Sequence, residues 1–540
     1  MQYSHAKAGA LGALALFWSL AGCSGNGGGS GPAPTYQVGG TVEGLGAGGT
    51  LVVQLNGGND LTITGDGTFE FPVQLTAGDS YSVTVLSGPG DYVTVQNGIG
   101  IAAADVADIT IACTSWRIPT DEDDSESPTA SDAQDPAVAI NALGNAIVVF
   151  SQYNDRDESQ IFVSALNDGV WHRPTDLTDH ISPLGEYAYA PKVAIAPTGD
   201  AIVVWVQYDG SRNRIFVATR DGGTWTYPAD LNAAISNGTT DAGDCSVAML
   251  PNGDAVVAWE QFDGSFYQIY KSERHAGVWS HPANLADNIS PNGQNAQDPF
   301  VATAGNGEIV IAYRQYDGSR YRTMKSEFRN AVWSHATSSS DAISPATQHA
   351  DTISVAMADN GDTLIVWRQL DGSHYQSFKS EYRSGSWVHP ANLTDNISPN
   401  GQNAYGVKVA MAPNGAATIV WQQYDGNSTA VFKSEYRNGT WTHPTGLTDN
   451  ITPDDIDCSE PAVAMSNDDA AISYVRYYGS YDAIYVTDYR SGSWRAPRRL
   501  SPELTDSWEP MMAMNSTGRA IVAWTAWTFT VDRVFASSYR

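Results

Sequence analysis

Cysteine, positive charge and long hydrophobic runs are all scarce in this chain of 540 residues. Beyond Cys23 only Cys113, Cys245 and Cys458 remain, an odd number, so at least one thiol is expected to stay free or to pair outside the chain. Lys and Arg number 29 against 59 Asp and Glu, and the net charge of -30 repels phosphate backbones, so nucleic acid is not an expected partner. The acidic excess is explained either by solubility or by cation binding.

No second hydrophobic span follows the first residues, and no helical period is evident, so the rest of the chain is expected to be exported, soluble and β-rich. What is abundant is aromatic residues, with 26 Tyr, 16 Trp and 14 Phe. Residues 409–450 show their arrangement. Three tight-turn signals, Asn414-Gly415, Asp425-Gly426 and Asn438-Gly439, separate short apolar runs and predict four strands in an up-and-down meander, over 409–412, 418–424, 430–436 and 440–444.

This unit recurs with a period of about 54 residues through the rest of the chain. One position of the first strand is apolar in every copy, at Val138, Val193, Val247, Val301, Val355, Val409, Val463 and Met512. A period of this length in an all-β pattern predicts a β-propeller or a β-solenoid. Four strands per unit favour the propeller, in which each blade is a four-stranded sheet.

The number of blades follows from a Trp in the fourth strand. Seven copies have it, at Trp171, Trp225, Trp279, Trp333, Trp387, Trp441 and Trp494. The eighth copy ends at Arg540 after its third strand, and the segment Ser115-Trp116-Arg117-Ile118-Pro119 matches residues 493–497. We therefore predict an all-β fold in which residues 114–540 form an eight-bladed β-propeller whose last blade is closed by strand 115–119, which removes exposed sheet edges. Seven blades are the alternative.

The first residues have the pattern of an export signal, with Lys7, an apolar run over 8–19, and Leu20-Ala21-Gly22-Cys23. The last four residues resemble a bacterial lipobox. The resemblance implies a signal peptide over 1–22, cleavage before Cys23, and lipidation of Cys23, whose acyl chains would anchor the protein in a lipid bilayer. Ser24 rather than Asp follows the cysteine, which implies the outer membrane. Residues 23–35 are rich in Gly and Ser and predict a flexible linker.

Residues 36–113 contain short alternating runs broken by turn signals, which predict a small β-sandwich. Val-Gly-Gly-Thr-Val at 38–42, Gly-Gly-Asn-Asp-Leu at 57–61 and Cys113 resemble a module common near the amino terminus of bacterial lipoproteins. That family usually has a second Cys near the position of Val93, which this chain lacks, so its usual disulfide is in doubt. We expect this module to be a spacer.

The turn at 220–225, Arg-Asp-Gly-Gly-Thr-Trp, resembles a degenerate Asp-box of the sialidase-like propellers, whose pattern is Ser-x-Asp-x-Gly-x-Thr-Trp. Most copies depart from the pattern, and residues 382–387 have no Asp. The resemblance implies the fold and no activity, because the motif is structural in that family.

Several repeated side chains have a structural interpretation. The aromatic residue of the second strand and the Trp of the fourth are expected to form the core between blades. His281, His335, His389 and His443 fall at one outer position of successive blades, too far apart to share a metal ion. Lys379, Glu381 and Arg383 share one face of a third strand and predict a charge ladder. We expect no metal and no cofactor.

The candidate ligand-binding residues lie at the turn between the second and third strands. Aromatic rings beside amides and carboxylates suit sugar rings, and repeated weak sites gain avidity. The alternative is that the motif serves only turn geometry and packing. The candidates are Gln207, Tyr208, Asp209, Gln261, Phe262, Asp263, Gln315, Tyr316, Asp317, Gln423, Tyr424 and Asp425.

A catalytic pair should break the repeat, and residues 154–158 do so with Asp155, Asp157 and Glu158. The change is explained equally by relaxed repetition near the closure of the ring, and no catalytic residue is assigned. We expect a monomeric, lipid-anchored protein of the bacterial cell envelope, facing the periplasm or the exterior, whose propeller binds a glycan or another envelope component. The alternatives are a scaffold for envelope assembly and a glycan-cleaving enzyme.

Overall fold

The computed structural model describes residues 33–45, 50–88, 92–114, 116–128, 131–467, 469–490, 492–503 and 505–539. The predicted signal peptide and Cys23 lie outside these residues. The chain divides into two compact units between Thr114 and Ser115, and each is described by itself. The described residues contain no α-helix, so none of their helices could cross a membrane. Two single-turn 3-10 helices are present, η1 (Glu122–Asp124) and η2 (Ser339–Asp341).

The first unit consists of short strands: β1 (Thr35–Tyr36), β2 (Val38–Glu43), β3 (Leu51–Leu55), β4 (Gly58–Ile63), β5 (Gly67–Glu70), β6 (Leu75–Thr76), β7 (Ser80–Ser87), β8 (Tyr92–Gln96), β9 (Ile99–Ile101) and β10 (Val106–Thr114). They form two four-stranded sheets, in the orders β5-β2-β10-β8 and β4-β3-β7-β9, and β1 pairs with β6. Both sheets contribute to one hydrophobic core, with Val38 and Ile111 from one and Val53 and Val83 from the other.

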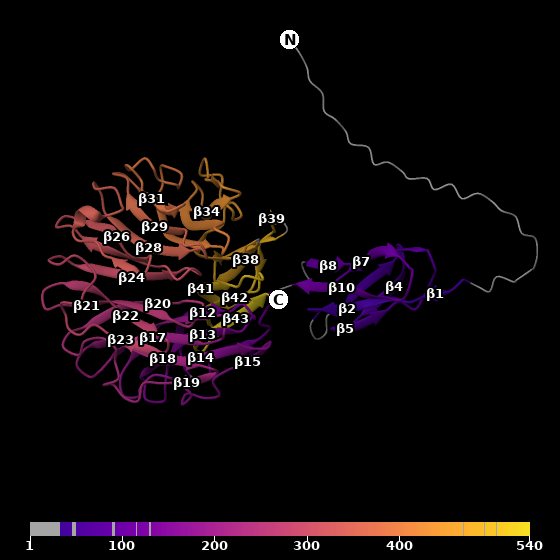
Figure 1. Ribbon diagram of the computed structural model, residues 1–540, viewed down its shortest axis with the longest axis horizontal. Coiled ribbons are helices and arrows are strands. Elements are labelled where there is room, and N and C mark those ends of the chain that lie inside the picture. Colours follow the sequence, from indigo (N-terminus) through magenta and orange to yellow (C-terminus); the bar gives the residue numbers. More distant parts are fainter. Residues whose placement is uncertain are drawn as a thin grey trace, which may run out of the picture. The chain divides into compact units, whose positions relative to one another are not determined.

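The second unit contains eight successive sheets, consistent with a β-propeller (Figure 1). Sheet 1 is β12 (Ala133–Ile140), β13 (Ala146–Tyr153), β14 (Ser159–Asn167) and β15 (Val170–His172). Sheet 2 is β16 (Ala188–Ile195), β17 (Ala201–Tyr208), β18 (Asn213–Asp221) and β19 (Thr224–Thr226). Sheet 3 is β20 (Ala242–Met249), β21 (Ala255–Phe262), β22 (Tyr267–His275) and β23 (Val278–Ser280). Sheet 4 is β24 (Ala296–Thr303), β25 (Ile309–Tyr316), β26 (Tyr321–Arg329) and β27 (Val332–Ser334).

The other four sheets repeat this arrangement. Sheet 5 is β28 (Ala350–Met357), β29 (Thr363–Leu370), β30 (Tyr375–Arg383) and β31 (Ser386–Val388). Sheet 6 is β32 (Ala404–Met411), β33 (Ala417–Tyr424), β34 (Thr429–Arg437) and β35 (Thr440–Thr442). Sheet 7 is β36 (Cys458–Met465), β37 (Ala470–Tyr477), β38 (Asp482–Arg490), β39 (Ser493–Trp494) and the added β40 (Arg498–Arg499). Sheet 8 is β41 (Asp506–Met514), β42 (Ala520–Trp527), β43 (Asp532–Tyr539) and β11 (Trp116–Arg117).

The last sheet combines the two ends of the unit. β11 pairs antiparallel with β43, with Trp116 opposite Tyr539, and their rings lie 5.5 Å apart. Sequence analysis assigned residues 115–119 to this place. The first strand of each sheet contacts the first strand of the next, and β12 contacts β41, so these eight strands form a closed inner ring (Figure 1).

The strands are antiparallel and sequential, so turns alternate between two edges of each sheet. We call the edge with the turns between second and third strands, such as Asp425-Gly426, the Asp-Gly edge. The opposite edge carries turns such as Asn414-Gly415 and Asn438-Gly439, and we call it the Asn-Gly edge. Loops between sheets return along the Asp-Gly edge.

The core between sheets confirms the predicted burial of the second-strand aromatic residues. Their side chains are completely enclosed at Phe150, Trp205, Trp259, Tyr313, Trp367, Trp421, Tyr474 and Trp524. The fourth-strand Trp residues are only half-buried, because they bridge neighbouring sheets. Trp387 Nε1 donates to Glu327 of sheet 4 at 3.0 Å, and Trp441 Nε1 donates to Glu381 of sheet 5 at 2.9 Å.

Two details differ from the sequence prediction. The first strand of sheet 6 begins at Ala404, not at 409, because a bulge interrupts the alternation of its side chains while pairing continues beyond it. For the same reason Cys245 lies within β20 and Cys458 begins β36, whereas both were expected before their strands. The described cysteines are free and buried, and burial raises the pKa of Cys245 to about 12 and that of Cys458 to about 11.

Candidate functional site

The predicted glutamines hold loops together. Gln207 is fully buried, and its Nε2 donates to the carbonyls of Pro183 at 2.7 Å and Glu186 at 3.1 Å, while its Oε1 accepts from Trp205 Nε1. The same pattern occurs at Gln261 and at Gln423, and Gln315 Nε2 donates to Pro291 O at 2.6 Å. Each amide therefore ties the second strand to the loop entering its own sheet, and no side-chain surface remains for a ligand.

The predicted aspartates shape the turns at the Asp-Gly edge. Asp209 Oδ1 accepts hydrogen bonds from the backbone N–H groups of Ser211 and Arg212 at 2.9 and 3.0 Å. Asp263, Asp317 and Asp425 accept the equivalent pair of bonds. The second oxygen of Asp209 accepts from Arg214 Nη1 at 3.2 Å. These carboxylates are therefore largely occupied within the turn.

The predicted aromatic residues are the part of the motif that faces outward. Tyr208 is 36% exposed and Tyr424 42%, whereas Phe262 and Tyr316 are half-buried against Tyr267 and Tyr321. The last residue of the second strand is aromatic in sheet 7 and sheet 8 as well, at Tyr477 and Trp527, and both are exposed. The Asp-Gly edge thus carries exposed aromatic rings at intervals around the ring of sheets.

The irregular segment of sheet 1 forms a turn of its own. Asn154 Oδ1 accepts from the backbone N–H groups of Arg156 and Glu158, and Asn154 Nδ2 donates to Glu158 Oε2 at 3.2 Å. Asp157 has a φ of 58°, in the left-handed region. The carboxylates of this segment therefore take part in a turn, and nothing in its geometry pairs two of them across a cavity.

A second group of polar residues lies on the inner ring, and sequence analysis missed it. Every first strand has a shift of register near its start, where one residue adopts a positive φ between 28° and 61°. Five of these eight residues are acidic. The eight are Asp135, Ala190, Asp244, Asp298, Thr352, Gly406, Glu460 and Glu509.

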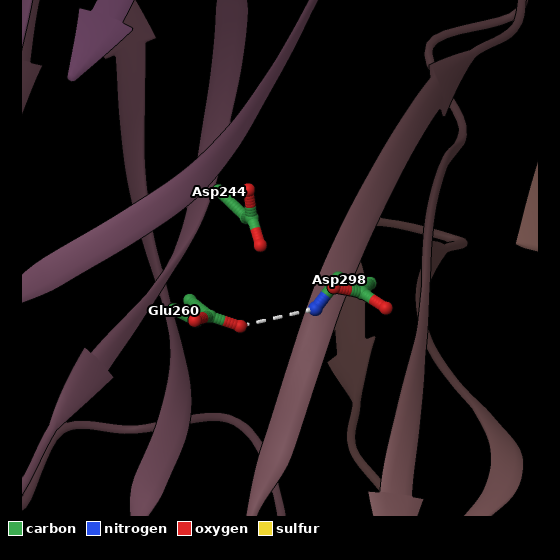
Figure 2. A group of neighbouring side chains, drawn as sticks. All are labelled: Asp244, Glu260 and Asp298. Atoms are coloured by element: carbon green, nitrogen blue, oxygen red, sulfur yellow. Dashed lines mark hydrogen bonds between the residues drawn. The ribbon is translucent and has the colours of Figure 1, made fainter. Parts of the chain in front are cut away.

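The acidic residues of sheets 3 and 4 meet in one cluster with Glu260 of β21 (Figure 2). One carboxylate oxygen of each of Asp244, Glu260 and Asp298 lies within 4.8 Å of those of the other two. Glu260 is buried, and its Oε2 accepts from the backbone N–H of Asp298 at 3.3 Å, the dashed line in Figure 2. Glu260 thereby satisfies a backbone donor that the bulge leaves unpaired.

Charge in this cluster is only partly balanced. Arg314 Nε lies 2.6 Å from Asp298 Oδ2. Burial and then the neighbouring Asp244 raise the pKa of Glu260 to about 7, and burial also raises the pKa of Asp298 against the effect of Arg314. Three carboxylates this close suit a hard divalent cation such as Ca²⁺, but Arg314 and a proton on Glu260 can supply the compensating charge instead.

A cavity of about 470 Å³ lies beside the inner ring at sheets 5–8. Its walls combine apolar side chains, among them Val463 and Met512, with Lys408, Glu460 and Glu509. Glu460 Oε2 accepts from the backbone N–H of Glu509 at 2.8 Å, which repeats the arrangement of Glu260 and Asp298. Burial lowers the pKa of Lys408 and raises that of Glu509.

The repeated histidines pack on tryptophans rather than around a common centre. His389 stacks on Trp387 with ring centroids 5.6 Å apart, and its Nδ1 lies 3.0 Å from Ser380 Oγ. His443 has the same contacts with Trp441 and Ser434. Burial lowers the pKa of both rings, so they are neutral packing elements at neutral pH.

No family model matches this chain, and no curated protein matches it. Solved structures with a similar arrangement include the BP39L lectin from Burkholderia pseudomallei, which is 16% identical, with 69% of this chain and 100% of the lectin covered and a TM-score of 0.47. Another is the Hadza microbial sialidase Hz136, at 12% identity, with 88% and 79% covered and a TM-score of 0.32. The polysaccharide lyase Uly1 is 9% identical, with 67% and 90% covered and a TM-score of 0.39. Identities and TM-scores this low carry no functional argument.

Proposed function

We propose that residues 115–540 form an eight-bladed β-propeller that binds glycans through the aromatic residues of its Asp-Gly edge. The observation that carries the proposal is the position of these rings. At the end of the second strand, the buried Gln fixes the loop, the Asp fixes the turn, and the intervening aromatic side chain is left facing solvent at Tyr208 and Tyr424. Exposed aromatic faces next to hydrogen-bonding backbone groups are suited to sugar rings.

We further propose the cellular setting that the sequence indicates. The first unit is a β-sandwich that acts as a spacer, and Cys23 carries the acyl chains that anchor the protein in the outer membrane of a bacterial envelope. The protein is monomeric there, and several equivalent aromatic sites on one edge would give avidity for a repeating polymer.

The test is a glycan-array measurement on the full-length protein and on the double variant Tyr208→Ala/Tyr424→Ala. We expect the glycan signal to fall at least tenfold in the double variant, because both exposed rings are lost. Tyr227→Ala is the matched control, since Tyr227 is 47% exposed but follows the fourth strand of sheet 2.

Three outcomes would contradict glycan binding. Equal signals from the double variant and the control would show that the aromatic edge is not the site. Absence of any glycan signal together with co-purification of an envelope protein would favour the scaffold. Glycan hydrolysis lost on changing Asp155, Asp157 or Glu158 would favour an enzyme.

A further inference from the structure

The Asn-Gly edge carries a repeated arginine at the end of the third strand. It is present in sheets 4–7, at Arg329, Arg383, Arg437 and Arg490. In sheet 5, Arg383 Nη1 lies 3.2 Å from Asp362 Oδ2, and it also donates to the carbonyl of Gly415 in sheet 6 at 3.0 Å. In sheet 7, Arg490 Nη1 has the same two kinds of partner, Asp469 at 2.6 Å and Gly518 O at 3.0 Å.

The acidic partner always occupies the residue just before the second strand. It is Glu308 in sheet 4, where it pairs with Arg329, and Asp254 in sheet 3, where it lies 3.3 Å from His275. In sheet 6 this position is Ala416. The arginine of sheet 6 has therefore kept its place in the repeat while its carboxylate partner is missing.

The missing carboxylate leaves Arg437 short of partners among the described residues. Its Nε donates to Glu435 Oε1 at 3.1 Å, and its guanidinium stacks over Tyr489 at 3.8 Å. Neither Nη atom has a hydrogen bond to a described residue, and Nη2 is buried. A buried guanidinium donor without a partner costs free energy that a bound acceptor would recover.

The charge balance shows the same gap. In sheet 5 the two cations Lys379 and Arg383 are matched by two anions, Glu381 and Asp362. In sheet 6, Lys433 and Arg437 share Glu435 alone. One positive charge of this group is therefore not balanced within it.

The space beside Arg437 is open. A cavity of about 460 Å³ is lined by Ala416 and Arg437, by the aromatic rings of Tyr436 and Tyr489, and by Asn414 and Asn438. It lies between sheets 6 and 7, where the side chain of an acidic residue at position 416 would point. The cavity combines an unbalanced guanidinium with amide groups and ring faces.

We propose that this cavity is a binding site for a carboxylate group of an external ligand, which takes the place of the carboxylate missing at position 416. A single carboxylate balances the one unmatched charge, and it fits the two parallel donors of a guanidinium. A dianion such as phosphate would leave an excess negative charge beside Glu435. The site lies on the opposite edge from the aromatic residues of the proposed glycan site, so either can fail without the other.

The test uses calorimetric titration of the full-length protein with sodium D-glucuronate and with D-glucose at equal ionic strength. The two sugars differ at one position, a carboxylate in place of a hydroxymethyl group. We expect glucuronate to bind and glucose to bind at least tenfold more weakly. Arg437→Gln should reduce the affinity for glucuronate at least tenfold, whereas Arg383→Gln, at the equivalent position with its partners in place, should leave it unchanged.

A second variant restores the repeat. Ala416→Asp supplies the carboxylate from within the chain, so it should abolish glucuronate binding and raise the melting temperature. Equal binding of glucuronate to the wild type, Arg437→Gln and Ala416→Asp would overturn the proposal, as would absence of binding to the wild type.

One residue of the sequence offers a competing explanation. Asp468 stands where the equivalent turns have glycine, and it lies outside the described residues. If glucuronate bound only after Asp468→Gly, the chain itself would supply the carboxylate and the proposal would be wrong. Binding to the wild type that Asp468→Gly leaves equal or stronger supports the site.

Discussion

Neighbouring residues of the Asp-Gly edge have opposite roles. Gln207 is enclosed and bonded to two loop carbonyls, while the ring of Tyr208 is exposed. We expect Gln207→Ala to lower the free energy of unfolding by about 1–3 kcal/mol, because it leaves buried carbonyls without donors. Urea unfolding followed by Trp fluorescence measures this change.

Tyr208→Ala is the control for that prediction. Because its ring already contacts water, we expect its effect on stability to stay within about 0.5 kcal/mol. If the two variants lost equal stability, the division between a structural amide and a free ring would be wrong.

Glu260 should make stability fall as pH rises. Its pKa is raised from 4.5 to about 7 by burial and by Asp244, so the folded protein holds this proton more tightly than the unfolded chain does. The contribution is greatest below pH 4.5 and is lost progressively between pH 4.5 and 7, by about 3 kcal/mol at 1.36 kcal/mol per pKa unit. We expect Glu260→Gln to raise the melting temperature at pH 8 and to have little effect at pH 4.5.

The difference between the two melting profiles isolates this residue from other groups that titrate. Parallel profiles for the wild type and Glu260→Gln between pH 4.5 and 8 would mean that Glu260 is ionised throughout. A cation held by the three carboxylates would have that effect, since it lowers their pKa values.

At the scale of the element, the third strands join neighbouring sheets. Glu381 accepts from Lys379 and Arg383 of its own strand and from Trp441 of sheet 6, and the Arg383 guanidinium stacks over Tyr436 at 3.7 Å. Burial alone would raise the pKa of Glu381, but Lys379 and these hydrogen bonds outweigh it and lower the pKa. Stability from this group is therefore present above its ordinary pKa and is lost as the solution becomes more acidic than that.

Glu381→Gln tests the strand ladder. We expect a loss of about 1–3 kcal/mol at pH 7, because two half-buried cations lose their shared anion. The loss should shrink at pH 3, where the wild-type carboxyl is protonated as well. Glu260→Gln is the opposite control, since its sign at neutral pH is reversed; two variants that shift stability in the same direction would contradict these assignments.

At the scale of the whole molecule, spacing alone located most of the sheets. Turn pairs such as Asp425-Gly426 need positive φ, and Trp421 recurs one period from Trp367, so strand number and core follow from local chemistry. The bulge of the first strand could not be read this way. Ala190 and Thr352 adopt positive φ although their side chains disfavour it, and only contacts of the inner ring impose that conformation.

The acidic cluster was hidden for a related reason. Asp244 and Asp298 occupy one repeat position, which a search of the first strand could have found, but Glu260 comes from another strand and stands alone in the repeat. Its closeness to them depends on two sheets meeting at the ring centre. The opposite holds for Arg437, whose site is visible only because the repeat defines what Ala416 has replaced.

Closure of the ring gives the last prediction. β11 covers the outer edge of β43, and Trp116 is 4% exposed, so removing this strand uncovers both a sheet edge and an aromatic side chain. A chain that begins at Asp121 should melt at a lower temperature than a chain that begins at Ser115, with a loss of about 3–5 kcal/mol expected for the Trp alone. Both chains lack the first unit, so the comparison isolates β11. Equal melting temperatures would show that the pairing of Trp116 with Tyr539 does not close the ring.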